Sequence, residues 1–214
     1  MRINRSVWGL LAVAGLAFAA GRLSIVLGGQ PLASAKPGQD QPDMEMSAEM
    51  AAMAKAGAPG EHHQYLNQMI GEWEGMFTMW MEPGEEAMMR MPGTVKREWV
   101  LDGRYIHETV DSESEWGKFR GIGYMGYNNI DGQYEFIWMD NMSTAIMFET
   151  GTYDPDSKVL TTRGSHRDPA SGHVFSSRGT LDLSDPNRHT YIGYATGPDG
   201  KEFKHFEGIM ERKK

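Results

Sequence analysis

The chain of 214 residues contains 40% hydrophobic and 23% charged residues, a balance that fits a globular protein with a sizeable core. Its formal net charge of −8 argues against binding to phosphate backbones, so we expect no nucleic-acid partner. It has no cysteine, which excludes disulfides, thiolate metal sites and a cysteine nucleophile.

The first 29 residues have the pattern of an export signal or a membrane anchor. Arg2 and Arg5 precede an apolar run over residues 7–20, and no acidic residue occurs before Asp40. Small residues at 17 and 19, and at 33 and 35, offer two cleavage sites, whereas an uncleaved span over residues 7–27 is long enough to cross a membrane. Either alternative predicts a domain outside the cytoplasm, periplasmic or membrane-anchored, with membrane contact only through an uncleaved N-terminal segment.

Residues 30–60 are rich in Pro, Gln, Ala, Gly and Met and contain no aromatic residue, which predicts a disordered linker. Within it, Ser47 is placed to cap a short helix that continues to Ala56. Soft thioethers can bind cuprous ion, which makes copper binding an alternative function of this linker. The methionines concerned are Met44, Met46, Met50 and Met53. Against this, methionine is frequent throughout the chain, with 17 residues in all.

Residues 61–214 are expected to form an all-β domain, an up-and-down antiparallel barrel of about ten strands with one short N-terminal helix. Helical periodicity covers only His62–Ile70. The segments after it show the two-residue alternation of strands and are separated by turn sequences such as Asp102-Gly103 and Asp131-Gly132. The absence of helices between strands excludes parallel pairing, and short connections favour pairing of neighbours. The predicted strands are Glu72–Met81, Thr94–Leu101, Arg104–Asp111, Gly117–Asn128, Tyr134–Met139, Ala145–Thr152, Val159–Ser165, His173–Leu183, Thr190–Thr196 and Glu202–Arg212.

Closure of such a barrel makes the first and last strands neighbours. Trp73 and Arg212 could then meet, with the guanidinium over the indole. A barrel of eight or more strands can hold one small ligand, which is the physical reason to expect an interior pocket.

Several motifs in this order resemble the bacterial DUF1579 family, a domain of unknown function, over about Glu61–Lys213. They are Gly71–Gly75, Glu98–Tyr105, Phe119–Tyr127, Tyr134–Thr144, Gly151–Asp154 and Pro198–Glu202. The family is similar to calycins, meaning lipocalins and nitrobindin-type haem barrels, and Gly71, Trp73 and Arg212 resemble the lipocalin structural signature. The resemblance therefore implies a calycin-like barrel, and it implies no activity because the family has none established.

The candidate ligand-binding residues lie on the predicted strands or directly after them. They are Trp99, His107, Tyr124, Tyr127, Phe136, Trp138, Asp140 and His205. Their aromatic members could line an apolar pocket or fill it. His107 and His205 fall in mid-strand, and the resemblance to nitrobindin-type barrels makes His205 the candidate haem ligand. Asp140 could bind a polar group of the ligand or only the amides of its own turn.

The leading hypothesis is an exported protein that binds a small, largely apolar molecule, with enzymatic activity left open. The sequence contains no Gly-x-Ser-x-Gly, no His-Glu-x-x-His and no phosphate loop, so we assign no catalytic or metal-binding residue. The alternatives are a nitrobindin-type barrel with haem as cofactor, periplasmic copper binding through the linker, and an isomerase- or decarboxylase-like enzyme. The last would use His107, Glu108, Asp140, His205 and Glu207.

Overall fold

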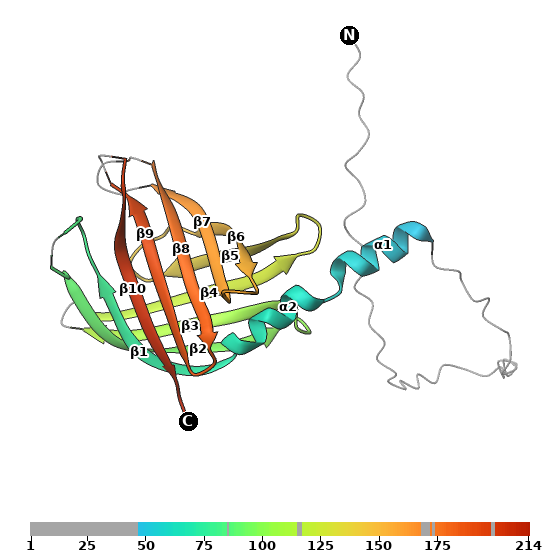
Figure 1. Ribbon diagram of the computed structural model, residues 1–214, viewed down its shortest axis with the longest axis horizontal. Helices are drawn as coiled ribbons and strands as arrows, with labels where there is room; N and C mark the ends of the chain where they lie inside the picture. The colour runs from blue at the N-terminus through green and yellow to red at the C-terminus, as the bar shows by residue number, and fades with distance from the viewer. Residues whose placement is uncertain (1–46, 85, 115–116, 168–171, 173, 198–199) are drawn as a thin grey trace, which may run out of the picture. The chain divides into compact units, whose positions relative to one another are not determined.

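The computed structural model describes residues 47–84, 86–114, 117–167, 172, 174–197 and 200–214 (Figure 1). Two short α-helices, α1 (Ala48–Gly57) and α2 (Glu61–Tyr65), and a 3₁₀ helix, η1 (Leu66–Met69), precede the strands. The strands are β1 (Gly71–Met79), β2 (Met89–Val100), β3 (Tyr105–Ser114), β4 (Gly117–Asn128), β5 (Gln133–Asp140), β6 (Met147–Asp154), β7 (Val159–Arg167), β8 (Val174–Asp185), β9 (Arg188–Thr196) and β10 (Glu202–Arg212). The predicted signal or anchor, residues 1–29, lies outside the described residues.

The ten strands form one closed antiparallel barrel, in the order β1-β10-β9-β8-β7-β6-β5-β4-β3-β2. Every strand pairs with its neighbours in sequence, and the circle closes where Trp73 of β1 lies opposite Arg212 of β10. The predicted up-and-down barrel is therefore confirmed. None of the helices in the described ranges has the length and apolar character needed to cross a membrane.

The N-terminal helices differ in detail from the prediction. Ser47 caps α1 by accepting a hydrogen bond from the backbone N of Met50 at 3.2 Å, as expected. The single helix expected over His62–Ile70 is instead a five-residue α-helix that tightens into η1. The i→i+3 hydrogen bonds of such a 3₁₀ turn satisfy carbonyls that the end of an α-helix leaves free. Gly71, with φ of 129°, then turns the chain into β1.

The end of the barrel beside η1 is sealed, and we call the interior there the closed half. Seven side chains that fill it are at most 2% exposed: Leu66, Met69, Trp73, Ile106, Leu160, Leu183 and His189. We call the opposite half of the interior the open half. Side chains there that alternate inward along the strands are only partly buried; they include Phe119, Phe136, Trp138, His166, Phe175, His205 and Phe206. One half is thus almost completely buried, and the other keeps partly exposed side chains.

Arg212 fastens the closed half where the barrel closes. Its guanidinium lies 4.1 Å above the ring centre of Trp73 and donates to the carbonyls of Ile70 at 2.6 Å and Gln68 at 2.8 Å. Trp73 donates its indole N–H to the carbonyl of Met69 at 2.9 Å. A Cβ on Gly71 would lie 2.6 Å from Arg212 Nη1, so only glycine leaves room for the guanidinium. These contacts bind η1, β1 and β10 together.

Candidate functional site

A cluster of polar side chains faces the open half from three adjacent strands. Glu149 of β6 is 7% exposed, and its carboxylate accepts hydrogen bonds from Thr162 Oγ1 at 2.5 Å and from Ser177 Oγ at 2.9 Å. His166 Nε2 lies 2.8 Å from Ser177 Oγ and 3.5 Å from Glu149 Oε1. These four residues, which we call the Glu149 cluster, place a carboxylate inside a barrel whose other inward side chains are mostly apolar.

The surroundings of Glu149 keep its carboxylate ionised. Burial alone would raise the pKa of Glu149, but hydrogen bonds from His166, Thr162 and Ser177 outweigh it and hold the pKa below its ordinary value. Tyr191 of β9 lies close by, and burial, followed by the charges of Glu149 and Glu108, raises the pKa of its phenol. The Glu149 carboxylate is therefore anionic and Tyr191 is neutral at neutral pH.

Inward-facing glycines make room for these groups. A Cβ on Gly179 would lie 2.7 Å from Thr162 Oγ1 and 2.8 Å from Tyr191 Oη. A Cβ on Gly193 would lie 3.1 Å from His205 Nε2. Glycine at these inward positions lets polar side chains from neighbouring strands reach over the sheet, which a larger residue would prevent.

A β-bulge turns His205 toward the interior. Lys204 pairs with Tyr194 and Phe206 pairs with Gly193, which leaves His205 as the extra residue between them. Strict alternation predicts that His205 and Phe206 lie on opposite faces; this is wrong, because the bulge shifts the register and both face inward. Burial lowers the pKa of His205, His166 lowers it further and Glu149 opposes the shift, so the imidazole is neutral at neutral pH.

The Glu149 cluster is not a Ser-His-acid triad. In such a triad one ring nitrogen faces the serine and the other faces the acid. Here Ser177 and Glu149 both approach Nε2 of His166. With the carboxylate ionised, His166 Nε2–H can donate to Ser177, whose hydroxyl donates to Glu149, so the cluster satisfies itself and presents no activated nucleophile. The expected absence of a catalytic residue stays a prediction.

Phe136 and Trp138, expected as pocket residues, border the open half. Phe136 is the cross-strand neighbour of Glu149, and its ring centre lies 6.2 Å from that of Trp138. Trp138 donates its indole N–H to Asp140 at 2.9 Å, and Asp140 also accepts from the backbone N of Met142 at 2.9 Å. Asp140 thus holds Trp138 and its own turn, the structural alternative that the sequence left open.

Trp99 and Tyr127 lie instead toward the helical end. Trp99 donates its indole N–H to Asn67 Oδ1 in η1 at 2.9 Å. The ring of Tyr127 stacks on His62 of α2 with centres 4.0 Å apart. Both side chains attach the helices to the barrel, so they do not belong to the open half.

His107 and Tyr124 face outward, contrary to the expectation that they line an interior pocket. They alternate with buried residues, Ile106 and Val110 on β3 and Met125 on β4, and therefore share the outer face. Their rings stack on each other with centres 4.9 Å apart. Of the residues expected for an enzyme, Glu207 also lies outside, where it pairs with Lys204 at 3.1 Å. Glu108 lies inside but is paired with Arg97.

Glu149, Thr162 and Ser177 were not among the site residues expected from the sequence, nor was His166, which lies one residue before the end of β7. A signal was present, because Glu149, Thr162 and Ser177 are polar residues at positions that alternate inward. Within the described ranges, no group of three or more His, Asp or Glu side chains is arranged to hold a metal ion. For the predicted copper site, Met50 and Met53 are exposed on α1, while Met44 and Met46 lie outside the described residues.

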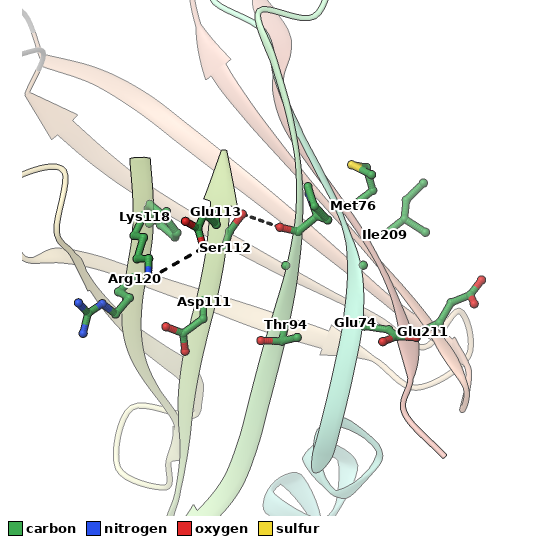
Figure 2. Close-up of a pocket in the computed structure, with 14 residues that line it drawn as sticks. Glu74, Met76, Thr94, Asp111, Ser112, Glu113, Lys118, Arg120, Ile209 and Glu211 are labelled. Atoms are coloured by element: carbon green, nitrogen blue, oxygen red, sulfur yellow. Dashed lines mark hydrogen bonds and ion pairs between the residues drawn. The ribbon is translucent and has the colours of Figure 1, made fainter. Parts of the chain in front are cut away.

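A groove of about 860 Å³ crosses the outer face of β10, β1, β2, β3 and β4 (Figure 2). Glu74, Glu211, Asp111 and Arg120 form a row across these strands, and Met76 beside them is 44% exposed. This groove is open to solvent and is lined by exposed charged side chains. A desolvated carboxylate among aromatic rings is the stronger indication of a binding site, so the open half is the candidate site.

Comparison with known proteins agrees with the fold. The family model described as "Protein of unknown function (DUF1579)" matches residues 58–212. No curated protein matches the chain significantly. The crystal structure of Rv2717c from M. tuberculosis is similar with a TM-score of 0.53 and 16% sequence identity, and the match covers 73% of this chain and 100% of that one. At this identity the likeness shows a shared fold and nothing about a ligand.

Proposed function

The chain belongs to the DUF1579 family of proteins of unknown function, and from its interior we propose that the barrel binds a small, largely apolar molecule in the open half. The walls offered to such a ligand are the partly exposed rings of Phe136, Trp138 and Phe206. The Glu149 cluster offers a polar anchor at one side of this wall. Few polar groups on a mostly apolar surface are typical of small-molecule sites.

The observation that carries the proposal is the position of Glu149. A buried ionised carboxylate costs free energy of folding, and here only neutral donors and a histidine compensate it. An apolar side chain at this position would pack without that cost. A buried carboxylate without a Lys or Arg partner, beside partly exposed aromatic rings, is best accounted for by a ligand that it contacts.

Tryptophan fluorescence can locate the ligand. Trp138 faces the open half, whereas Trp80 lies beneath Lys204, whose Nζ is 4.2 Å from its ring centre on the outer face. Titration of the full chain with the neutral probe 1-decanol is expected to change the fluorescence. The change should disappear in Trp138→Phe and persist in the matched control Trp80→Phe.

Either of two results would contradict interior binding. One is a fluorescence change that persists in Trp138→Phe and is lost in Trp80→Phe, which would place the probe outside the barrel. The other is the absence of any change together with no shift in the unfolding temperature of the native chain, since a ligand that binds only the folded state must raise that temperature.

A haem group is a second candidate ligand, favoured by the bulge at His205. The imidazole faces inward, and its lowered pKa leaves a neutral ring nitrogen of the kind that ligates haem iron. Gly193 lets this ring pack against the backbone of β9, because a Cβ there would lie 3.1 Å from Nε2. These residues fit an axial ligand, and the iron would supply binding of small gases or electron transfer.

Visible absorption tests this second candidate. Haem added to the full chain is expected to give a shifted Soret band that His205→Ala abolishes and that His166→Ala retains. An identical Soret band in the native chain and in His205→Ala would remove His205 as the ligand and leave only unspecific uptake.

We further propose that the domain acts outside the cytoplasm, which rests on the sequence of residues 1–29 alone. Cell fractionation of the full chain against a variant that lacks residues 1–29 is the test. Recovery of both proteins in the cytoplasm would contradict export.

A further inference from the structure

We infer that the polar end of the ligand is a protonated amine rather than a carboxylate. This inference rests on the proposed function, because it concerns which apolar molecules the open half accepts. It follows from the charges, the free acceptor positions and the aromatic surface around Glu149.

The charge of Glu149 is not neutralised by a Lys or Arg among its recorded partners in the described part of the chain. Its hydrogen-bond and ion-pair partners are Thr162 and Ser177, which are neutral, and His166. The groups that face it from β9 and β10 are Tyr191 and His205, both neutral at neutral pH. With the His166 imidazole in its neutral form, the Glu149 cluster therefore presents negative charge to anything that enters.

The other interior carboxylate differs in this respect. Glu108 is ion-paired with Arg97, whose side chain is 5% exposed. That pair cancels its own net charge, and Arg97 Nη1 is the one donor of the guanidinium that is buried without a hydrogen-bond partner among the described residues. A fatty-acid carboxylate beside Glu149 would meet a like charge in a poorly solvated interior, which strongly disfavours its ionised form.

Glu149 also has an acceptor position to spare. A carboxylate offers about four lone-pair positions on its two oxygens. Ser177 and His166 approach Oε1, whereas Oε2 receives only Thr162. An ammonium group has three donors and no acceptor, so it can use the remaining position on Oε2 without displacing an existing hydrogen bond.

The neighbouring wall favours the same kind of ligand. Phe136 lies directly across from Glu149 on β5, and Trp138 follows two residues later on the same inward face. Aromatic faces attract cations through their quadrupole, and they bury the carbon chain attached to them. A cationic amphiphile, meaning an amine with an apolar body, fits both features at once.

The test compares three probes of equal chain length on the full chain: decylamine, 1-decanol and decanoate. At neutral pH and low salt we expect decylamine to bind at least about tenfold more tightly than 1-decanol, and decanoate to bind more weakly than either. The measurement is displacement of a neutral fluorescent probe, so that all three ligands are read in the same way.

Two matched variants assign the preference to Glu149. Glu149→Gln keeps the shape and removes the charge, so decylamine affinity should fall to that of 1-decanol and decanoate affinity should rise. Glu207→Gln removes a carboxylate from the outer face and should change none of the three affinities.

The outcomes separate the two proposals. Decanoate binding to the native chain as tightly as decylamine would overturn the amine inference and leave interior binding intact. Failure of all three probes to bind would overturn interior binding itself. Because this ranking is measured on the native chain, it stands even where Glu149→Gln folds poorly.

Discussion

The two halves of the barrel interior contain similar residue types but differ in how a buried carboxylate is compensated. In the closed half, Glu108 is paired with Arg97, and the surrounding aliphatic and aromatic side chains are almost completely buried. In the open half, Glu149 is satisfied by hydroxyls and an imidazole, and the aromatic side chains beside it remain partly exposed. A carboxylate that is paired with an arginine suits a sealed core, whereas a carboxylate that only accepts hydrogen bonds can still interact with a charged ligand.

The largest expected difference between the halves is in the cost of removing an indole. Trp73→Ala should lower the free energy of unfolding by about 3–5 kcal/mol, because the fully buried ring leaves a cavity and an unpaired Met69 carbonyl. Trp138→Ala in the open half should cost clearly less, since water already reaches that ring. Urea unfolding of both variants measures this; equal losses would contradict the division into a closed and an open half.

The closed half should also respond to acid through His189. This histidine is 0% exposed, neither ring nitrogen has a hydrogen-bond partner among the described residues, and its pKa is lowered to about 3 by burial and by Arg97 and Arg212. Between pH 6.5 and 3, His189 is protonated in the unfolded chain and neutral in the folded chain. The free energy of unfolding should therefore decrease as the pH is lowered through this window, by up to about 1.4 kcal/mol per pH unit from this group.

His189→Leu is the variant that isolates this effect. It should flatten the loss of stability between neutral pH and pH 3 while leaving the free energy of unfolding at pH 7 changed only slightly, because leucine needs no hydrogen-bond partner. Unfolding curves across this pH range are the measurement. An unchanged pH dependence in the variant would show that other groups cause the acid sensitivity.

Arg212→Lys should be intermediate in effect. Lysine keeps the charge but cannot donate in the fork geometry that reaches the carbonyls of Ile70 and Gln68 together. We expect a loss of about 1–3 kcal/mol, which corresponds to two hydrogen bonds and the contact with Trp73. Thermal unfolding is the measurement, and a variant as stable as the native chain would contradict the role of this side chain in closing the barrel.

The smallest effect is expected on the outer face. Arg178 donates to Glu202 at 2.8 Å and its guanidinium lies 3.8 Å from the ring centre of Tyr194. Such solvent-facing pairs contribute about 0.2–1 kcal/mol, so Arg178→Ala should stay within that range and lose part of it at high salt. A loss comparable to that of Trp73→Ala would mean that the outer face contributes as much as the closed half.

The sequence by itself determined the number of strands, their order and the closure of the barrel, whereas β2 begins at Met89 and not at the predicted Thr94. Turn residues such as Asp131-Gly132 and alternation along each strand are local signals, and short connections leave neighbours as the pairing partners. Closure makes β1 and β10 neighbours, and their register then places Trp73 opposite Arg212. These features need no knowledge of which face points inward.

The tertiary structure alone decided which side chains meet inside. Glu149, Thr162 and Ser177 come from three strands, and their meeting depends on the pairing register, which side-chain periodicity does not specify when both faces carry apolar residues. His205 reached the interior through a bulge that adds one residue to β10 and reverses the alternation before it. A shift of one residue exchanges the two faces of a strand, so the barrel could be predicted from local pattern while its binding site could not.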